Sequence, residues 1–551
     1  MDSPTISSQP ADTNGWDTVY ALKFPDVNAE IVRKKSSPKC FHHDIENKGG
    51  VKTTLDGKFG DWQLVVGGDG KDLHMSLPIP SSTVVGGYFG STAQTCTHVT
   101  AIIEVNLLWV NSDNAAANKQ ELITNVSSAD ATQPPVSVLV LDFSKDTTGG
   151  LDEIGQSIYK GMLLDWLSSA IKEFKHVFSM ITLNTILDGM SGFEWMVPTD
   201  TLYAVTDVAD NLEDSIFSVL CMTGNRPNPE AHQVSPYAIP PSTDPQHPIN
   251  SVFLISPARL LENMMLPGVP LMFKDSPALS SFTVDATTIK NNVQLQFPDQ
   301  DLYDKENVYV GTAHPVVEAG NFIIELVDNV INFVISGMHF EWKPGVTVTV
   351  DHTSKATLVL NPDRKFKLTV QNGAFSSFNV EISDGLSDGM IAASIGLAVA
   401  GAALGGFLGG ASTAATSTAT EAVTVTVADG VEDALSNIES EAVSDAEAQV
   451  GGAPGKFSNF FSVNWAKMLG GMIGGAIGGS TAAIPGILTK LANDGAHYMV
   501  PTLDLFGTAV MKPITWPNMD TTGDIVVGGR LNGALQIALY LKPLPAAPAA
   551  A

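Results

Sequence analysis

The chain has 551 residues, of which 58 are acidic and 30 are basic, so its formal net charge at pH 7 is −28. A surface this negative repels phosphate backbones, which excludes nucleic acid as an expected partner. Three widely spaced cysteines without a CxxC pair argue against a disulfide framework and against a zinc site.

The N-terminal residues carry no targeting signal of the secretory type. Residues 1–14 lack both a basic region and an apolar core, so we expect a disordered tail there and no cleavable signal peptide. The Ala/Pro-rich residues 546–551 are expected to form a second disordered tail. The protein is therefore expected to be made in the cytoplasm, and any release would follow a non-classical secretion route.

Strand signals and one long helix dominate residues 15–223. Alternating or β-branched residues at 62–66, 99–110 and 136–143 predict strands. From residue 151 onward, apolar side chains recur at about every fourth position, which predicts an amphipathic helix of about seven turns. The apolar face of this helix comprises Ile154, Ile158, Met162, Trp166, Phe174 and Phe178. A core helix packed on a sheet and a helix that lines an apolar tunnel both fit the pattern.

A proline-rich segment separates this region from the next. Residues 224–249 contain seven prolines and few apolar side chains, which predicts an extended loop or linker and a domain boundary. Residues 250–545 are then expected to form a second region. Within it, alternation of apolar and polar residues over 322–382 predicts an antiparallel meander with one face in water.

Two apolar segments of the second region carry a glycine at every fourth position. In the first segment these are Gly401, Gly405 and Gly409. A helix with such a row has a smooth groove along one side, so two of these helices can approach closely. We therefore predict apolar helices at 385–411 and 463–492.

Both a buried helical pair and a membrane-inserting hairpin fit these segments. In the hairpin, residues 389–411 and 468–489 would enter the bilayer, although their many glycines and alanines add little affinity for lipid. Residues 421–450, between them, are acidic and are expected to form a mobile or surface helix. In the buried arrangement, the apolar side chains available to a ligand are Leu404, Phe407 and Leu408.

No motif for catalysis occurs in a supporting context. The sequence contains no GxSxG elbow, HExxH helix, P-loop lysine or GxGxxG turn of the expected kind. His42 and His43 lie near Asp44, a combination that can hold a metal ion, but neighbouring lysines favour a solvated loop. We therefore predict a protein that is not an enzyme and that has no catalytic residues, no cofactor and no metal site.

Two sequence blocks resemble those of a known family. They are NGWDTVY at 14–20 and GDWQLVVGG at 60–68. Together with residues 326–342 and 524–539, they are similar to the clostridial accessory proteins encoded beside botulinum neurotoxin in OrfX-type clusters. That group resembles the TULIP superfamily of tubular lipid-binding proteins, in which a strongly curved antiparallel sheet wraps a long helix around an apolar tunnel.

The resemblance implies an α+β fold with TULIP-like regions at 15–223 and 250–545. It implies a lipid or fatty-acid-like ligand, no catalytic residues, and a role as an accessory component of a toxin or secreted virulence gene cluster. Toxin-complex proteins are then further candidate partners, and contact with a membrane is compatible with this role. Two alternatives stay open: a membrane-inserting protein that uses the glycine-grooved hairpin, and a structural scaffold in a toxin complex.

Overall fold

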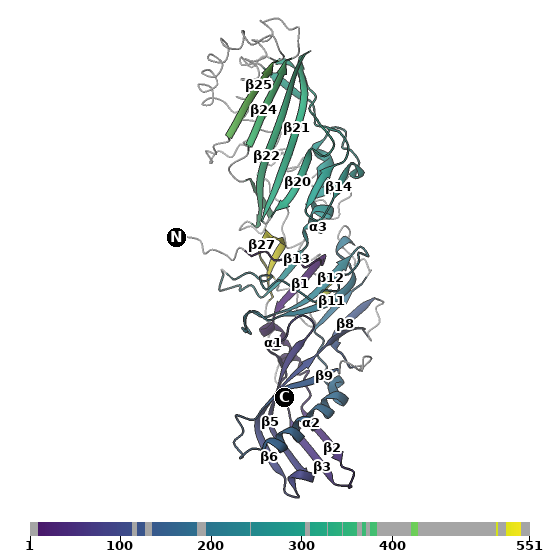
Figure 1. Ribbon diagram of the computed structural model, residues 1–551, viewed down its shortest axis with the longest axis vertical. Coiled ribbons are helices and arrows are strands. Elements are labelled where there is room, and N and C mark those ends of the chain that lie inside the picture. The colour runs from purple at the N-terminus through teal and green to yellow at the C-terminus, as the bar shows by residue number, and fades with distance from the viewer. Residues whose placement is uncertain are drawn as a thin grey trace.

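The computed structural model of the chain is an elongated molecule built mainly from β-strands (Figure 1). The described residues are 9–112, 118–126, 135–183, 194–242, 244–303, 309–327, 329–343, 345–360, 366–370, 375–382, 420–427, 514–515 and 525–541. Within these ranges, long antiparallel strands curve around few helices. This arrangement confirms the α+β class with strongly curved antiparallel sheets.

Six strands form the sheet at the lower end of the molecule in Figure 1. They are β2 (Cys40–Glu46), β3 (Lys52–Lys58), β4 (Gln63–Leu64), β5 (Leu73–Gly86), β6 (Gln94–Val105) and β9 (Val136–Asp142). The order is β2-β3-β5-β6-β9, with β4 paired to β5. Buried and part-exposed positions alternate along β5, as expected for a sheet with one face in the core. Helix α2 (Glu153–Ala170) contacts β2, β3 and β9 and lies across this sheet.

Helix α2 is shorter than the sequence predicted. It ends at Ala170 and continues only as a 3₁₀ turn at Ile171–Glu173. The chain then becomes extended, and the N–H of Phe178 donates to the carbonyl of Leu122 at 2.8 Å before β10 (Ser179–Thr182) begins. Backbone pairing with a distant strand thus replaces the last helical turns. The four-residue spacing of apolar residues continues past the helix because helix and strand bury their side chains in the same interior.

A smaller sheet and the short helices connect these elements. The sheet has the order β26-β10-β8-β7 and contains β7 (Leu107–Asn111), β8 (Lys119–Thr124), β10 and β26 (Ile514–Thr515).

Helix α1 (Phe24–Lys34), which the sequence did not predict, buries Val27 and Ile31. Its Asn28 side chain donates to the Leu64 carbonyl at 3.1 Å and accepts from the Leu64 N–H at 2.7 Å, which docks the helix on β4. Single 3₁₀ turns occur at Gly87–Phe89, Glu194–Met196 and Leu279–Ser281.

The largest sheet contains both the first strand of the chain and its last two strands, at the middle of the molecule (Figure 1). Its central strands have the order β11-β12-β1-β13-β28-β27. Their bounds are β1 (Thr18–Lys23), β11 (Pro198–Thr206), β12 (Ile216–Thr223), β13 (Ser251–Ile255), β27 (Ile525–Asn532) and β28 (Ala534–Tyr540). Strand β1 therefore pairs with strands that precede and follow the proline-rich segment.

Two of the central strands, β12 and β13, are buried on both faces. Every residue of β12 and of β13 is buried. The proline-rich loop covers one face, where Trp16 Nε1 donates to the Ala231 carbonyl at 2.8 Å and Gln536 Nε2 donates to the Ala238 carbonyl at 2.6 Å. Because neither face meets water, β12 and β13 are apolar at most positions and do not alternate.

The same sheet continues into the upper part of the molecule as β22-β21-β20-β15-β14, with further strands attached beside this path. The bounds are β14 (Phe282–Val284), β15 (Thr288–Asn291), β16 (Leu295–Gln296), β19 (Val316–Val317), β20 (Phe322–Val327), β21 (Val330–Lys343), β22 (Val346–Leu360), β23 (Phe366–Val370), β24 (Phe375–Ile382) and β25 (Thr420–Val427). A separate hairpin joins β17 (Gln300–Tyr303) to β18 (Tyr309–Ala313). The segment 257–272 is helical, as α3 (Pro257–Arg259), a π-helix (Leu260–Met265) and a 3₁₀ helix (Leu266–Met272).

One part of the predicted acidic helix is a strand instead. Thr420–Val427 forms β25, which pairs in parallel with β24. Alternating valine and threonine residues suit a strand better than a helix, since β-branched side chains favour strands. The predicted apolar helices at 385–411 and 463–492, and residues 428–450, lie outside the described residues.

Candidate functional site

Helix α2 starts at a well-defined cap. The Asp152 carboxylate accepts a hydrogen bond from the Gly155 N–H at 2.8 Å and another from the Tyr88 hydroxyl at 2.5 Å. Such a cap satisfies a backbone donor that the first helical turn leaves free. The helix then presents one face to the sheet, and the buried residues of that face are Gly155, Tyr159, Met162, Leu163, Trp166, Leu167 and Ala170.

Aromatic side chains from the helix, the sheet and the following segment meet beneath α2. Trp166 contacts Phe41 and Phe59, with ring centroids 5.7 and 5.3 Å apart. Phe59 meets the edge of Trp62 at 5.4 Å, and Trp62 stacks on Phe174 at 4.9 Å. We call this cluster, together with the buried face of α2, the first interior.

The first interior continues toward the central strands. Phe178 follows Phe174 with ring centroids 6.2 Å apart, and it contacts Phe217 of β12 at 5.5 Å. Phe217 in turn stacks on Tyr203 of β11 at 6.4 Å. A continuous series of rings therefore runs from the helix-covered sheet into the largest sheet.

The residues that were predicted to face a ligand from α2 differ in how deeply the structure buries them. Met162 and Trp166 are buried on the sheet side of the helix. Ile158 is partly buried and packs against the same core, whereas Ile154 is 58% exposed in the first helical turn and lies outside the interior. Phe174 and Phe178 are buried in the first interior, although they follow the helix instead of belonging to it. The remaining predicted residues, which are Leu404, Phe407 and Leu408, lie outside the described residues.

Sequence reasoning missed the strand residues of the first interior. Phe41 and Trp62 come from β2 and the approach to β4, and Phe217 comes from the fully buried β12. Trp62 belongs to the GDWQLVVGG block and to the predicted strand 62–66, but neither pattern predicted that its ring lies in the interior. The period-two pattern of β2, in which Phe41 is the buried position, is a signal that could have identified Phe41.

A second interior, also missed, lies beneath the helical segment 257–272. Phe273 contacts Phe297 at 4.7 Å and Phe322 at 5.0 Å, and Phe322 contacts Phe333 at 5.3 Å. The helical segment contributes buried aliphatic and thioether side chains, namely Leu260, Leu261, Met264, Met265, Val269 and Met272. The run of leucine and methionine between prolines is the sequence signal for this cover.

The polar groups of the first interior are neutral and hydrogen-bonded. Tyr159 donates to the Ser82 hydroxyl at 2.9 Å, and burial raises the pKa of this phenol. Tyr203 donates to the Lys71 carbonyl at 2.7 Å, and burial raises its pKa to about 12. His176 lies 3.3 Å from the Ser36 hydroxyl through Nδ1, and burial, with a further contribution from Lys34, lowers its pKa to about 3. These groups stay uncharged at neutral pH, so they can tolerate an apolar neighbour.

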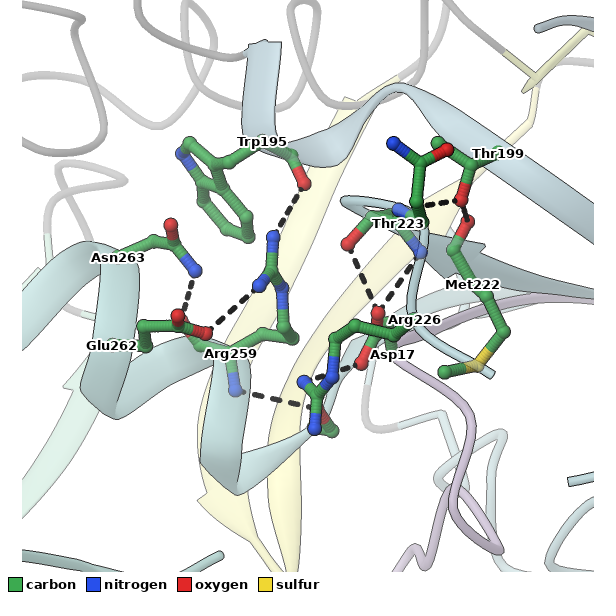
Figure 2. A network of polar contacts seen from close by, with 11 residues as sticks. Asp17, Trp195, Thr199, Met222, Thr223, Arg226, Arg259, Glu262 and Asn263 are labelled. Atoms are coloured by element: carbon green, nitrogen blue, oxygen red, sulfur yellow. Dashed lines mark hydrogen bonds and ion pairs between the residues drawn. The ribbon is translucent and has the colours of Figure 1, made fainter. Parts of the chain in front are cut away.

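A charged network fixes the end of the central strands instead (Figure 2). Asp17, which is 1% exposed, accepts from the Thr223 N–H at 2.9 Å, from the Thr223 hydroxyl at 3.0 Å and from Arg226 Nη1 at 2.9 Å. Nearby, buried Arg259 donates to the Trp195 carbonyl at 2.9 Å and to Glu262 at 2.8 Å, and its guanidinium lies over the Trp195 ring. The N–H of Ser256 donates to the Asp17 carbonyl at 2.9 Å, which joins the residue before β1 and the end of β12 to the start of the segment 257–272. The role of these contacts is positioning.

The histidines singled out in the sequence lie on a surface hairpin. His42 contacts Asp56 at 2.7 Å and Asp44 at 3.2 Å, and its side chain is exposed on β2. Within the described ranges, no group of three or more His, Cys, Asp or Glu side chains is arranged to hold a metal ion. Among the same residues, no helix has the length and apolar character needed to cross a bilayer.

Comparison with known families gives a match over most of the chain. The model of a family described as "OrfX-like: Protein OrfX2/OrfX3/P47" matches residues 13–446. Protein OrfX3 of Paraclostridium bifermentans is 33% identical over 291 residues, which is 49% of this chain and 57% of that protein. Protein OrfX3 of Clostridium botulinum (strain Kyoto / Type A2) is 28% identical over 292 residues, which is 48% of this chain and 56% of that protein. The chain spans little more than half the length of these curated relatives.

A solved structure extends the likeness to the whole fold. The crystal structure of P47 of Clostridium botulinum E1 has a TM-score of 0.56 with this chain and 15% sequence identity. The likeness covers 96% of this chain and 99% of the P47 chain. At this level of identity, the comparison concerns the fold alone.

Proposed function

Because the chain belongs to the OrfX-like family of OrfX2, OrfX3 and P47 proteins, we propose that it is a non-enzymatic binding protein for a lipid or another apolar ligand. In this proposal it serves as an accessory component of a toxin or secreted virulence gene cluster, with toxin-complex proteins as partners. Its two sheet-and-helix regions act as TULIP-like modules that share the largest sheet.

The observation that supports this proposal best is the continuity of the apolar interior. Buried apolar side chains form one cluster that includes Phe41 beneath α2, Phe253 in the central strands and Phe322 in the second interior. The strands and helices that carry these residues follow one another along the long axis of the molecule (Figure 1). A fatty acyl chain is long, flexible and apolar, so a long apolar interior matches its shape better than that of a compact polar metabolite.

The ligand's acyl chain would lie between α2 and the sheet, against Met162, Trp166, Phe174 and Phe178. Methionine can change rotamer at low cost, so Met162 can make room for a chain that inserts beside the rings. Each methylene removed from water contributes about 0.8 kcal/mol, which is enough to give useful affinity without any charged contact. The neutral hydroxyls of Tyr159 and Ser82 lie beside this position and can meet a polar head group.

Lipid content tests the proposal directly. We expect organic extracts of the purified full-length chain to contain a copurifying lipid in mass spectra, and we expect the protein to take up a fluorescent fatty acid. A diazirine-bearing fatty acid should label peptides that contain Met162 or Trp166. A chain without extractable lipid, without uptake and without labelling at α2 would overturn the proposal.

A matched pair of variants locates the site on α2. Met162→Trp adds bulk to the buried face of the helix, and Ile154→Trp adds the same residue to its exposed face. Fatty acid uptake should fall strongly in the first variant and stay unchanged in the second, with circular dichroism used to check that both are folded. Equal uptake by two folded variants would place the ligand elsewhere. If Met162→Trp does not fold, the labelling of the wild-type chain still decides the question.

A further inference from the structure

The end of helix α1 and the segment after helix α2 lie side by side. The N–H of Lys175 donates to the Ser36 carbonyl at 3.1 Å, and the Ser36 hydroxyl lies 3.3 Å from His176 Nδ1. The Ser37 hydroxyl accepts from the N–H of Trp62 at 2.9 Å, and the Trp62 ring stacks on Phe174. Two chain segments that are far apart in sequence, residues 35–39 and 172–175, are therefore joined at one surface.

These two segments carry four exposed lysines, Lys35, Lys39, Lys172 and Lys175, which we call the lysine patch. The described ion pairs of lysine side chains involve other residues, namely Lys23, Lys52 and Lys274. Within the part of the chain that the structure describes, no carboxylate lies within ion-pairing distance of the four patch lysines. Their charges are thus available to a partner.

The nearby carboxylates are too few to neutralise the patch. Glu173 and Asp61 are exposed on the adjoining segments, while Glu30 is engaged by Arg33 at 2.7 Å. Glu121 lies near Lys34 and accepts a hydrogen bond from the Ser112 hydroxyl at 2.7 Å. Half-buried Lys34 adds another positive charge beside the patch, although burial lowers its pKa. A local excess of positive charge on a chain whose net charge is −28 stands out from the rest of the surface.

We propose that the lysine patch docks an acidic, extended segment of a partner protein. Carboxylate side chains complement the unpaired ammonium groups, and such charge complementarity sets both specificity and association rate. An extended segment can reach the patch without bringing a second large acidic body close to this one. The proposal does not depend on whether the interior holds a lipid.

A flat anionic membrane fits this surface less well. Helix α1 lies between the two ends of the long axis (Figure 1), so a bilayer that touched the patch would also approach other parts of a chain whose net charge is −28. Repulsion between this net negative charge and anionic head groups opposes such contact. A polypeptide is narrow enough to avoid it.

The test is the binding of a fluorescein-labelled peptide of alternating Glu and Ser to the full-length chain, followed by fluorescence anisotropy. We expect binding that weakens as salt is raised, since salt screens exposed charges. The patch variant, Lys35→Glu with Lys39→Glu, Lys172→Glu and Lys175→Glu, should bind at least about tenfold more weakly.

The control variant carries the same change of charge elsewhere, at four exposed lysines: Lys48→Glu, Lys71→Glu, Lys145→Glu and Lys290→Glu. It should keep most of the peptide affinity. An equal loss in both variants would reduce the effect to net charge and overturn the proposal, as would a wild-type chain that does not bind the peptide. Binding of phosphatidylserine vesicles through the patch lysines, without peptide binding, would assign the surface to a membrane and overturn it as well.

Discussion

The first and second interiors are both covered by a helical segment, but the two segments differ in helix geometry and in the side chains that they bury. Each lies between a curved antiparallel sheet and a helical cover, and each contains a cluster of aromatic rings. The first is covered by the regular helix α2, with Trp166 on its buried face. The second is covered by the segment 257–272, which changes from α to π to 3₁₀ geometry and contributes three methionines.

The difference shows that the burial of apolar side chains, more than helix propensity, determines which segment packs over each interior. Pro267 and Pro270 prevent a regular helix in the second segment, yet its apolar side chains are as well buried as those of α2. Methionine adapts to irregular gaps, whereas a tryptophan ring needs a matched site. We therefore expect the first interior to be the more sensitive to truncation and the second to be the more adaptable.

The largest expected effect comes from truncating a ring in each interior. Trp166→Ala should destabilise the chain by about 4 kcal/mol, since it removes a ring that contacts Phe41 and Phe59. Phe322→Ala should cost about 3 kcal/mol, because the second interior includes buried methionines, whose flexible side chains can adjust to the lost volume. Urea unfolding measures both values. Ile154→Ala on the exposed face of α2 is the control and should stay within about 0.5 kcal/mol, and a Phe322 effect larger than that of Trp166 would contradict the comparison.

Acidic pH should lower the free energy of unfolding through one buried histidine in each region. Burial lowers the pKa of His176 in the first region and of His352 in the second to about 3. The unfolded chain, with histidine pKa values near 6.5, binds more protons than the folded chain below that pH, so stability falls as pH drops from about 6.5 toward 3. The loss should be on the order of 1 kcal/mol per pH unit for each histidine.

Protonation of Asp26 changes the stability of the fold in the opposite direction. Burial raises its pKa to about 6, so the folded state binds the extra proton and gains stability as pH falls from about 6 toward 3.8. Because two histidines oppose one aspartate, the net effect of acid is destabilising. His176→Gln and His352→Gln should each flatten the dependence of urea stability on pH between 6.5 and 4.5. A pH profile that is unchanged in both variants would refute this account.

The smallest expected effect is the loss of stability when the N-terminal cap of α2 or of the segment 257–272 is removed. Asp152→Ala should cost about 1 kcal/mol, since it removes the acceptor 2.8 Å from the Gly155 N–H. Ser256→Ala at the start of the second cover should cost less, because the bond of Ser256 to the Arg259 N–H is longer, at 3.4 Å. Thermal unfolding of the two variants compares them, and equal losses would mean that bond length is not what separates the caps.

Local pattern accounted for much of the first interior. The change of period at residue 151 located α2, and its four-residue spacing selected Met162 and Trp166 as inward-facing residues. The four-residue spacing gave the wrong face for Ile154. A helix has 3.6 residues per turn, so positions four apart drift around it, and Ile154 lies on the exposed side. Local pattern also failed for the cover 257–272, whose prolines and methionines give no periodic signal.

The sequence by itself determined that this chain has antiparallel sheets, an amphipathic helix that starts near residue 151 and the blocks that resemble the OrfX-type proteins. These features depend on neighbouring residues or on short patterns. Only the tertiary structure decided where α2 ends, that β1 lies between β12 and β13, and that β28 joins them from the other end of the chain. The physical reason is that such pairings are hydrogen bonds between residues hundreds of positions apart, and strands buried on both faces carry no alternation that reveals their neighbours.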